Sequence, residues 1–141
     1  MICLPDVNVW IALAADAHLR HPVAKEWFLT CDFEGAAFCR VTQMSFLRLV
    51  TNRNVMTDEA LTVDQAWTAY RRPRGGRKIV YWSEPPAMHE DWSAFVRTRP
   101  AGRNVWTDAY LSAFAALSGM TVVTFDRAFP VTAGPPPLFL P

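Results

Sequence analysis

Short apolar segments that alternate with longer amphipathic segments are the feature that most constrains how this chain can fold. The apolar segments are typical of β-strands, which we expect at residues 2–4, 36–39, 79–82, 121–124 and, as a last edge strand, 138–140. A helical segment lies between most consecutive strands, so the strands are expected to pair in parallel. We therefore predict an α/β fold, a three-layer α/β/α sandwich with a mostly parallel central sheet.

The helical segments are bounded by residues that favour helix ends. Pro22 lies in the first turn of one helix, Thr62 precedes another as an N-cap, and Gly119 follows the end of a third. Thr42 is likewise predicted to be an N-cap. Helices are expected at 9–15, 21–28, 43–50, 63–70, 88–96 and 104–117. Neither an internal repeat nor a linker interrupts this pattern, so residues 1–141 are expected to form a single domain.

The composition excludes several classes of protein. Apolar residues make up 51% of the 141 residues and charged residues 19%, which argues against long disordered stretches. No apolar run reaches the roughly 18 residues needed to cross a bilayer, so no membrane association is expected. The first residues lack the basic and apolar regions of a secretion signal. The three cysteines have no C-x-x-C spacing, which argues against a disulfide framework and a zinc site. We expect a cytoplasmic protein.

Positive charge is concentrated between residues 71 and 78. This segment contains five cations and no acid, and removing them from the net charge of +1 leaves −4 for the remaining chain. A local basic loop attracts a polyanion at one place, which makes the loop a weak candidate for nucleic-acid binding. A solvated surface loop has the same composition, so both interpretations stay open. The candidate residues are Arg71, Arg72, Arg74, Arg77 and Lys78.

Three acids are expected at one edge of the sheet. Asp6 follows the first strand and Asp126 follows the strand at 121–124, where parallel strands commonly form sites beyond their carboxyl ends. Asp108 lies in the first turn of the helix that begins near residue 104, and that end of the helix must face the same edge. Each acid has an ordinary structural alternative, such as capping a helix or forming a turn. Their convergence is what suggests a function.

Convergent carboxylates require a cation. Like charges about 5 Å apart repel by roughly 3 kcal/mol per pair at an effective dielectric constant near 20. A hard divalent ion with oxygen ligands, Mg²⁺ or Mn²⁺, would offset that repulsion. Such an ion polarises a phosphoryl oxygen and lowers the pKa of a bound water, which suits phosphodiester hydrolysis.

Four short motifs follow one another along the chain: Asp6-Val-Asn8, the stretch from Thr42 to Asn52, Thr107-Asp108-Ala109-Tyr110-Leu111 and Thr124-Phe-Asp126-Arg127. Together they resemble a PIN-domain protein, specifically a VapC-type toxin of a prokaryotic toxin–antitoxin pair. The resemblance that they carry extends over nearly the whole chain. The resemblance implies an Mg²⁺-dependent endoribonuclease that cuts structured RNA, such as tRNA or rRNA, with Mn²⁺ as a plausible substitute. It also implies a cognate antitoxin, a homodimer and a sheet with helices on both faces.

The resemblance assigns a role to each acid. Asp6 and Asp108 would be the primary metal ligands, and Asp126 would complete the acidic pocket, in part through water. Asn8 and Thr124 would orient a carboxylate or a water molecule.

One position departs from the family pattern. PIN nucleases usually carry a fourth acid on the third helix, and Ser45 stands there in this chain. Ser45 would donate a hydrogen bond to a ligand carboxylate or to a phosphate. Three acids suit one well-held ion better than two, because paired ions need bridging carboxylates. Glu90 and Asp91 are candidate substitutes for the missing acid. Arg48 is expected to pair with an acid and anchor the fold.

The aromatic residues suggest a core and a partner surface. Trp10, Trp27 and Trp106 occupy apolar helix positions and are expected to pack internally. Trp67 and Trp92 lie on helices expected to meet a partner, where an exposed aromatic groove would suit a short antitoxin helix.

Two other functions remain as alternatives. A phosphatase of the haloacid-dehalogenase type also has an aspartate after its first strand. It needs a second aspartate where this chain has Asn8, and Lys25 and Lys78 are poorly placed for its lysine. A catalytically weak PIN fold that acts by binding RNA or its antitoxin is the other alternative, and Ser45 favours it.

Overall fold

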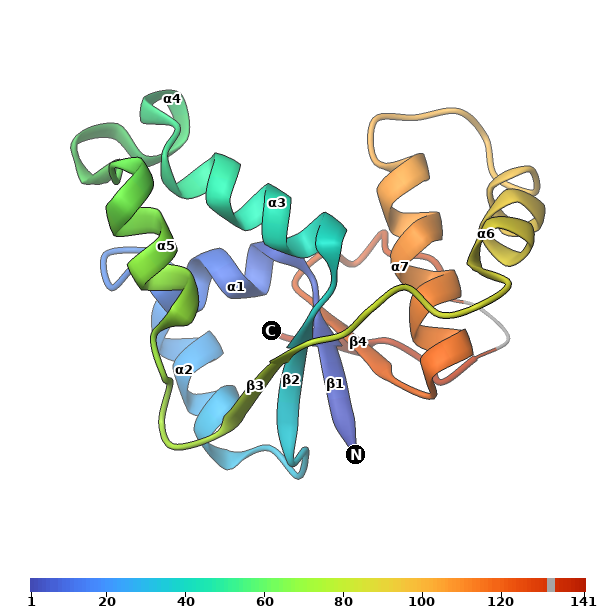
Figure 1. Ribbon diagram of the computed structural model, residues 1–141, viewed down its shortest axis with the longest axis horizontal. Helices are drawn as coiled ribbons and strands as arrows, with labels where there is room; N and C mark the ends of the chain where they lie inside the picture. The colour runs from blue at the N-terminus through green and yellow to red at the C-terminus, as the bar shows by residue number, and fades with distance from the viewer. Residues whose placement is uncertain (132–133) are drawn as a thin grey trace.

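A five-stranded parallel sheet forms the centre of the computed structural model, which describes residues 1–131 and 134–141 (Figure 1). The strand order is β3-β2-β1-β4-β5, and every pairing is parallel. The predicted α/β sandwich is therefore confirmed. The strands are β1 (Ile2–Pro5), β2 (Gly35–Phe38), β3 (Lys78–Tyr81), β4 (Thr121–Thr124) and β5 (Leu138–Phe139).

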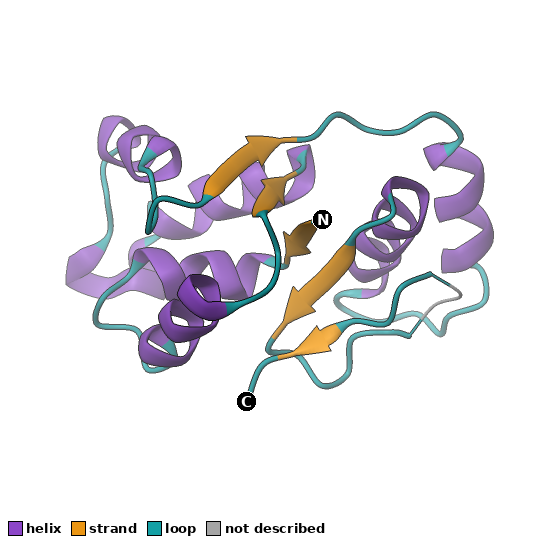
Figure 2. Cartoon of the chain, turned by 90° about the horizontal axis from the view of Figure 1, so that it is seen from below, coloured by secondary structure: helices purple, strands orange, loops and turns teal. Residues whose placement is uncertain are grey.

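Helices cover both faces of the sheet (Figures 1 and 2). The first face is covered by α1 (Val7–Ala14), α2 (His21–Thr30), α3 (Arg40–Val50) and α5 (Val63–Arg71). The second is covered by α6 (Met88–Val96) and α7 (Val105–Ser118). A short helix α4 (Arg53–Met56) and a 3₁₀ turn (Thr57–Glu59) connect α3 to α5. Among the described residues, no helix has both the length and the apolar character needed to span a bilayer.

Alternating side chains along the strands supply the two cores. In β1, Cys3 packs on the first face and Leu4 on the second. In β2, Phe38 points to the first face and Ala37 to the second. Both faces of a parallel sheet are thus buried, which explains the near-continuous apolar strands in the sequence.

A cluster of aromatic rings fixes α1 on the sheet. The ring of Trp10 stacks on Phe38 with centroids 3.9 Å apart and an interplanar angle of 14°. Phe46 of α3 and Tyr70 of α5 meet the Phe38 ring edge-on at 5.8 Å and 4.9 Å. Because these rings come from three helices and a strand, they hold the start of α1 in place relative to α3.

The helix caps agree with the sequence at one predicted threonine and differ at the other. Thr62 caps α5 as predicted: its Oγ1 accepts from the Gln65 backbone N–H at 3.2 Å. The prediction for Thr42 is wrong, since Cys39 is the N-cap of α3 and Thr42 lies three residues later. The Thr42 hydroxyl accepts from the Cys39 backbone N–H at 3.1 Å, so it closes a capping box instead.

The aromatic expectations hold only in part. Trp10 is buried, whereas Trp106 is 60% exposed and does not pack internally as predicted. Trp67 is 42% exposed and Trp92 is partly buried. They lie on α5 and α6, on opposite sides of the molecule (Figure 1), so they do not line one groove.

The basic loop lies at the amino end of the sheet, because it leads directly into β3. The Arg77 guanidinium donates to the backbone oxygens of Leu29 at 3.0 Å, Cys31 at 2.6 Å and Phe33, which the end of α2 leaves unpaired. Arg74 donates to the Ala69 oxygen at 2.7 Å. These two arginines therefore have a structural role. Nucleic-acid binding stays a prediction only for the exposed Arg71, Arg72 and Lys78.

Gly35 is expected to tolerate no side chain. A Cβ added there would lie 2.3 Å from the backbone oxygen of Lys78 on the neighbouring strand, so Gly35→Ala should lower the free energy of unfolding by about 1–3 kcal/mol. Urea denaturation measures the change. Gly102→Ala is the control, because nothing lies within 4 Å of its added Cβ. Equal unfolding midpoints for the two variants would contradict the close packing of β2 on β3.

Arg77→Met is expected to lower the free energy of unfolding by about 1.5–3 kcal/mol, because the charged hydrogen bonds to the end of α2 are lost. Arg72→Met, at an exposed position of the same loop, should change it by less than about 0.5 kcal/mol. Thermal or urea unfolding compares the variants. Unchanged stability in Arg77→Met together with weaker RNA binding would return Arg77 to the nucleic-acid candidates.

Candidate functional site

The carboxyl edge of the sheet brings together residues from the two ends of the chain. Asp6 follows β1, and its backbone N–H donates to the Val123 oxygen in β4 at 2.8 Å. Thr124, the last residue of β4, is thereby placed beside Asp6. Asp6 is also the N-cap of α1, which begins at the next residue.

The Asp6 carboxylate is 9% exposed and accepts three hydrogen bonds. Its Oδ1 accepts from the Val7 backbone N–H at 2.7 Å. Its Oδ2 accepts from the Thr124 hydroxyl at 3.0 Å and from the Asn8 side-chain amide at 3.1 Å. Asn8 and Thr124, the two residues expected to orient a carboxylate, are thus both in direct contact with Asp6.

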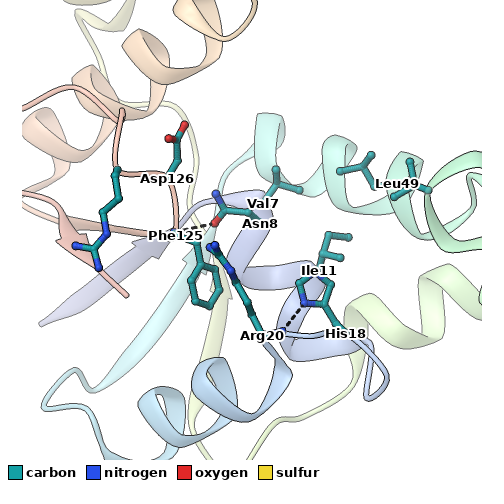
Figure 3. Close-up of a pocket in the computed structure, with 10 residues that line it drawn as sticks. Val7, Asn8, Ile11, His18, Arg20, Leu49, Phe125 and Asp126 are labelled. Atoms are coloured by element: carbon teal, nitrogen blue, oxygen red, sulfur yellow. Dashed lines mark hydrogen bonds between the residues drawn. The ribbon is translucent and has the colours of Figure 1, made fainter. Parts of the chain in front are cut away.

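Thr124 connects Asp6 to Asp126. The Thr124 hydroxyl accepts from the Asp126 backbone N–H at 3.0 Å while it donates to Asp6. Asp126 Oδ1 in turn accepts from the Ala128 backbone N–H at 2.9 Å, so Asp126 also shapes the turn after β4. Figure 3 shows Asp126 and Asn8 at the same rim of a cavity.

The pKa of Asp108, in the first turn of α7, depends on the charges of the other two acids. The pKa of its carboxyl is raised to about 6, first by partial burial and then by the charges of Asp6 and Asp126, with the charge of Arg99 opposing them. Burial also raises the pKa of Asp6, followed by a smaller contribution from Asp126, although the hydrogen bonds from Thr124, Val7 and Asn8 oppose the shift. The charges of Asp6 and Asp126 therefore disfavour ionisation of Asp108, and the charge of Asp126 also disfavours ionisation of Asp6.

The donor chemistry of this edge suits a hard cation, although the acids do not form a closed cage. Within residues 1–131 and 134–141, no three His, Cys, Asp or Glu side chains are grouped so that they could hold a metal ion. Local hydrogen bonds engage Asp6 and Asp126, which explains why they are not drawn together. Mg²⁺ usually keeps several waters and binds through one or two carboxylates, so an open set of oxygen donors is compatible with it.

A cavity of about 360 Å³ lies between α3 and α7, and Asp6 forms part of its wall. Ser45 and Arg48 line its α3 side, and Arg103 and Thr107 line its α7 side. The expectation that Arg48 pairs with an acid is wrong: within the described part of the chain its guanidinium forms no ion pair and faces this cavity. Ser45 borders the same space, as expected for the position of the missing acid.

A second cavity, of about 570 Å³, lies on the other side of the α1 start (Figure 3). Val7 and Leu49 line both cavities, so the two cavities are adjacent. The lining residues are Val7, Asn8, Ile11, His18, Arg20, Leu49, Val55, Phe125, Asp126 and Arg127.

Several site residues escape sequence reasoning. Arg20 and Arg103 belong to none of the sequence motifs, so only the fold shows that they line the cavities next to the acids. Asp91, a proposed substitute for the missing acid, lines a separate cavity between α6 and α7, beside Phe95. Glu90 is exposed on α6 and lines neither of the two cavities next to the acids.

Comparison with known proteins gives one consistent family. The PIN domain model matches residues 3–135. Ribonuclease VapC41 of Mycobacterium tuberculosis is 43% identical over 132 residues, which cover 89% of this chain and 90% of that protein.

Solved structures show the same fold at low sequence identity. Mycobacterium tuberculosis VapC20, described as a sarcin–ricin loop cleaving toxin, superposes with a TM-score of 0.65 at 19% identity over 92% of both chains. VapBC2 from Rickettsia felis, bound to a DNA fragment from its promoter, gives 0.59 at 12% identity over 92% of this chain and 91% of the other. The sequence matches and the shared fold together place this chain in the PIN-domain family, among its VapC-type members.

Proposed function

We propose that this protein is an Mg²⁺-dependent endoribonuclease toxin that hydrolyses phosphodiester bonds in structured RNA, such as tRNA or rRNA. The observation that supports the proposal most directly is the raised pKa of Asp108, produced by burial and by the neighbouring charges of Asp6 and Asp126. A carboxyl whose pKa is raised by burial and by neighbouring carboxylates is typical of functional sites. The relationship to Ribonuclease VapC41 supports RNA as the substrate.

Each residue of the site is assigned a role from its contacts. Asp6 and Asp108 would hold the cation, with Asp126 acting through water, and Mn²⁺ would serve as a substitute for Mg²⁺. The chemistry that such a cation supplies is polarisation of a phosphoryl oxygen and activation of water. Asn8 and Thr124 hold the Asp6 carboxylate in one orientation.

Arginines without an ion-pair partner, next to the acids, are suited to bind the phosphates of an RNA backbone. Arg48 and Arg103 border the cavity that contains Asp6, on opposite walls. A guanidinium binds phosphate through two parallel hydrogen bonds, so these side chains would fix the RNA backbone across the acids. Ser45 on the same wall would donate to a phosphate oxygen.

The similarity to VapC-type proteins also suggests which partners this protein has. VapBC2 is a structural relative that was crystallised with DNA from its promoter, and this supports a cognate antitoxin for the present chain. A homodimer stays a prediction, and so does a cytoplasmic location. The phosphatase alternative has no support from the family match.

Binding without cleavage is the second candidate function. Ser45 at the usual acidic position favours it, as does the lack of a three-acid cluster within the described residues. Cleavage of total RNA in Mg²⁺ compared with EDTA separates the two functions.

Asp6→Asn and Asp108→Asn are each expected to reduce Mn²⁺- or Mg²⁺-dependent RNA cleavage by about 100-fold or more, because the charge that attracts the cation is lost. Product formation on gels measures the rate, and thermal melting verifies that Asp6→Asn still folds. Asp32→Asn, at an exposed loop position, is the control. Cleavage near the wild-type rate in either site variant would contradict the metal-site proposal.

Asp108 is expected to destabilise the metal-free protein at neutral pH. Its pKa is about 6 in the folded state against an ordinary value of 3.8, so the folded state binds more protons between these values and stability falls as pH rises through them. In EDTA at about pH 7.5, Asp108→Asn should therefore raise the free energy of unfolding, by on the order of 1 kcal/mol after allowance for solvent screening.

Urea unfolding in EDTA measures this difference, which should disappear below about pH 4 because Asp108 is then protonated in both states. Added Mg²⁺ should stabilise the wild type more than Asp108→Asn, and Asp32→Asn should behave as the wild type throughout. A stability difference that stays constant from about pH 4 to 7.5 would show that the charge of Asp108 is not its cause.

A further inference from the structure

The larger cavity beside the acids has the size of a small-ligand site. Its volume of about 570 Å³ lies within the 300–1,000 Å³ typical of such pockets. Figure 3 shows Leu49 across the cavity from Phe125, and His18 at its lower edge. We call this cavity the Arg20 pocket, after the cation that extends into it.

Arg20 presents an unpaired planar cation. Its guanidinium carbon lies 4.8 Å from the centre of the Phe125 ring, and Phe125 itself is buried beneath it. Within residues 1–131 and 134–141 the Arg20 side chain forms no ion pair or hydrogen bond. A guanidinium that lies over a ring can offer its other face for stacking, which is how proteins commonly bind unpaired RNA bases.

The second arginine of the pocket is engaged elsewhere. Arg127 donates to the Leu140 oxygen at 3.3 Å and lies 5.7 Å from the centre of the Phe139 ring. Its side chain therefore secures the C-terminal strand. This leaves Arg20 as the cation of the pocket that is available to a ligand.

The opposite wall is apolar and reaches the surface. Leu49 at the end of α3 and Val55 on α4 line it, and Val55 is 50% exposed. Half of the Val55 surface is thus open to solvent, and a flat heterocycle placed between Val55 and Arg20 would cover it. A base fits this combination of an apolar wall and a planar cation better than a phosphate alone does.

Polar groups at the rim are suited to the edge of a base. The backbone N–H of Arg20 donates to His18 Nδ1 at 3.1 Å. Burial and the charges of Arg20 and His21 lower the pKa of His18, so its ring is neutral at neutral pH and Nε2 carries the hydrogen.

The pocket is continuous with the acids. Asn8 lines it and also donates to Asp6, and Asp126 lines it directly. Val7 and Leu49 belong to the walls of both this pocket and the cavity that contains Asp6. An RNA strand with a phosphate at Asp6 would therefore bring a neighbouring nucleotide to the pocket mouth.

We propose that the Arg20 pocket binds the base of an unpaired nucleotide next to the cleaved phosphodiester, stacked on the Arg20 guanidinium and against Leu49 and Val55. The proposal rests on the nuclease function proposed above and adds that the base beside the cut must leave its helix. A paired base could not reach the pocket, because its faces are covered by its neighbours.

Val55→Trp tests the proposal by filling the pocket mouth at a half-exposed position, where a larger side chain does not disturb the core. Val63→Trp is the matched control, because Val63 is 70% exposed on α5 and lies outside the pocket. RNA cleavage should show a KM raised about tenfold or more in Val55→Trp, with kcat within about twofold, and no change in Val63→Trp.

Binding is measured separately from cleavage, with the four 5′-ribonucleoside monophosphates in EDTA. In NMR spectra of the wild type, these probes should shift the Asn8 side-chain amide and the Phe125 and Arg127 backbone amides, and Val55→Trp should abolish the shifts. Arg20→Met and Arg20→Lys should both weaken binding about fivefold or more, because stacking requires the planar guanidinium. Full binding by Arg20→Lys would indicate a phosphate site and overturn the proposal.

The two proposals fail in different ways. Mononucleotide shifts at these amides that are lost in Val55→Trp support the pocket even if the wild type cleaves no RNA, and only the nuclease function then falls. An unchanged KM in Val55→Trp, or shifts confined to residues outside the pocket, overturns the pocket while metal-dependent cleavage still stands.

Discussion

A buried carboxylate, that of Asp6, is the constraint on which the rest of the site depends. A buried charge is costly unless hydrogen bonds compensate it, and Val7, Asn8 and Thr124 supply them. These bonds cap α1 and tie β1 to β4, so the group that shapes the local fold is also the candidate ligand. The compensation is incomplete, because burial still raises the pKa of Asp6. A cation at this edge would relieve that remaining cost.

The aromatic cluster around Phe38 explains how segments that are distant in sequence keep fixed positions relative to one another at the site. The Trp10 stack fixes α1 on the sheet, and Phe46 fixes α3 beside it. The cavities on either side of the α1 start therefore have rigid walls on one side. Their other walls come from α7 and the residues before it, from α4 and from the loop after α1, and Arg103 and Arg20 lie on the first and the last of these segments. Rigid acids between cationic walls are well suited to hold an RNA strand.

The sequence placed Asp6 and Asp126 just beyond the ends of two strands but did not place the arginines, for a physical reason. An aspartate at the end of a parallel strand has its position determined by the strand, so Asp6 and Asp126 were placed by local pattern. A long arginine side chain reaches whichever partner the fold brings near. Arg77 thus caps α2 from a different segment, and Arg48 faces a cavity instead of an acid. The short helix α4 escaped detection because four residues carry too little periodicity.

What the sequence by itself determined is the order of strands and helices, the parallel sheet and the edge of the sheet to which Asp6 and Asp126 belong. These features follow from local periodicity and from the handedness of strand–helix–strand connections. Only the tertiary structure decided which hydrogen bonds the acids accept, which of the described arginines lack a hydrogen-bond or ion-pair partner, and where the cavities lie. Those properties depend on contacts between residues more than a hundred positions apart, such as Asp6 with Thr124, and no local pattern encodes them.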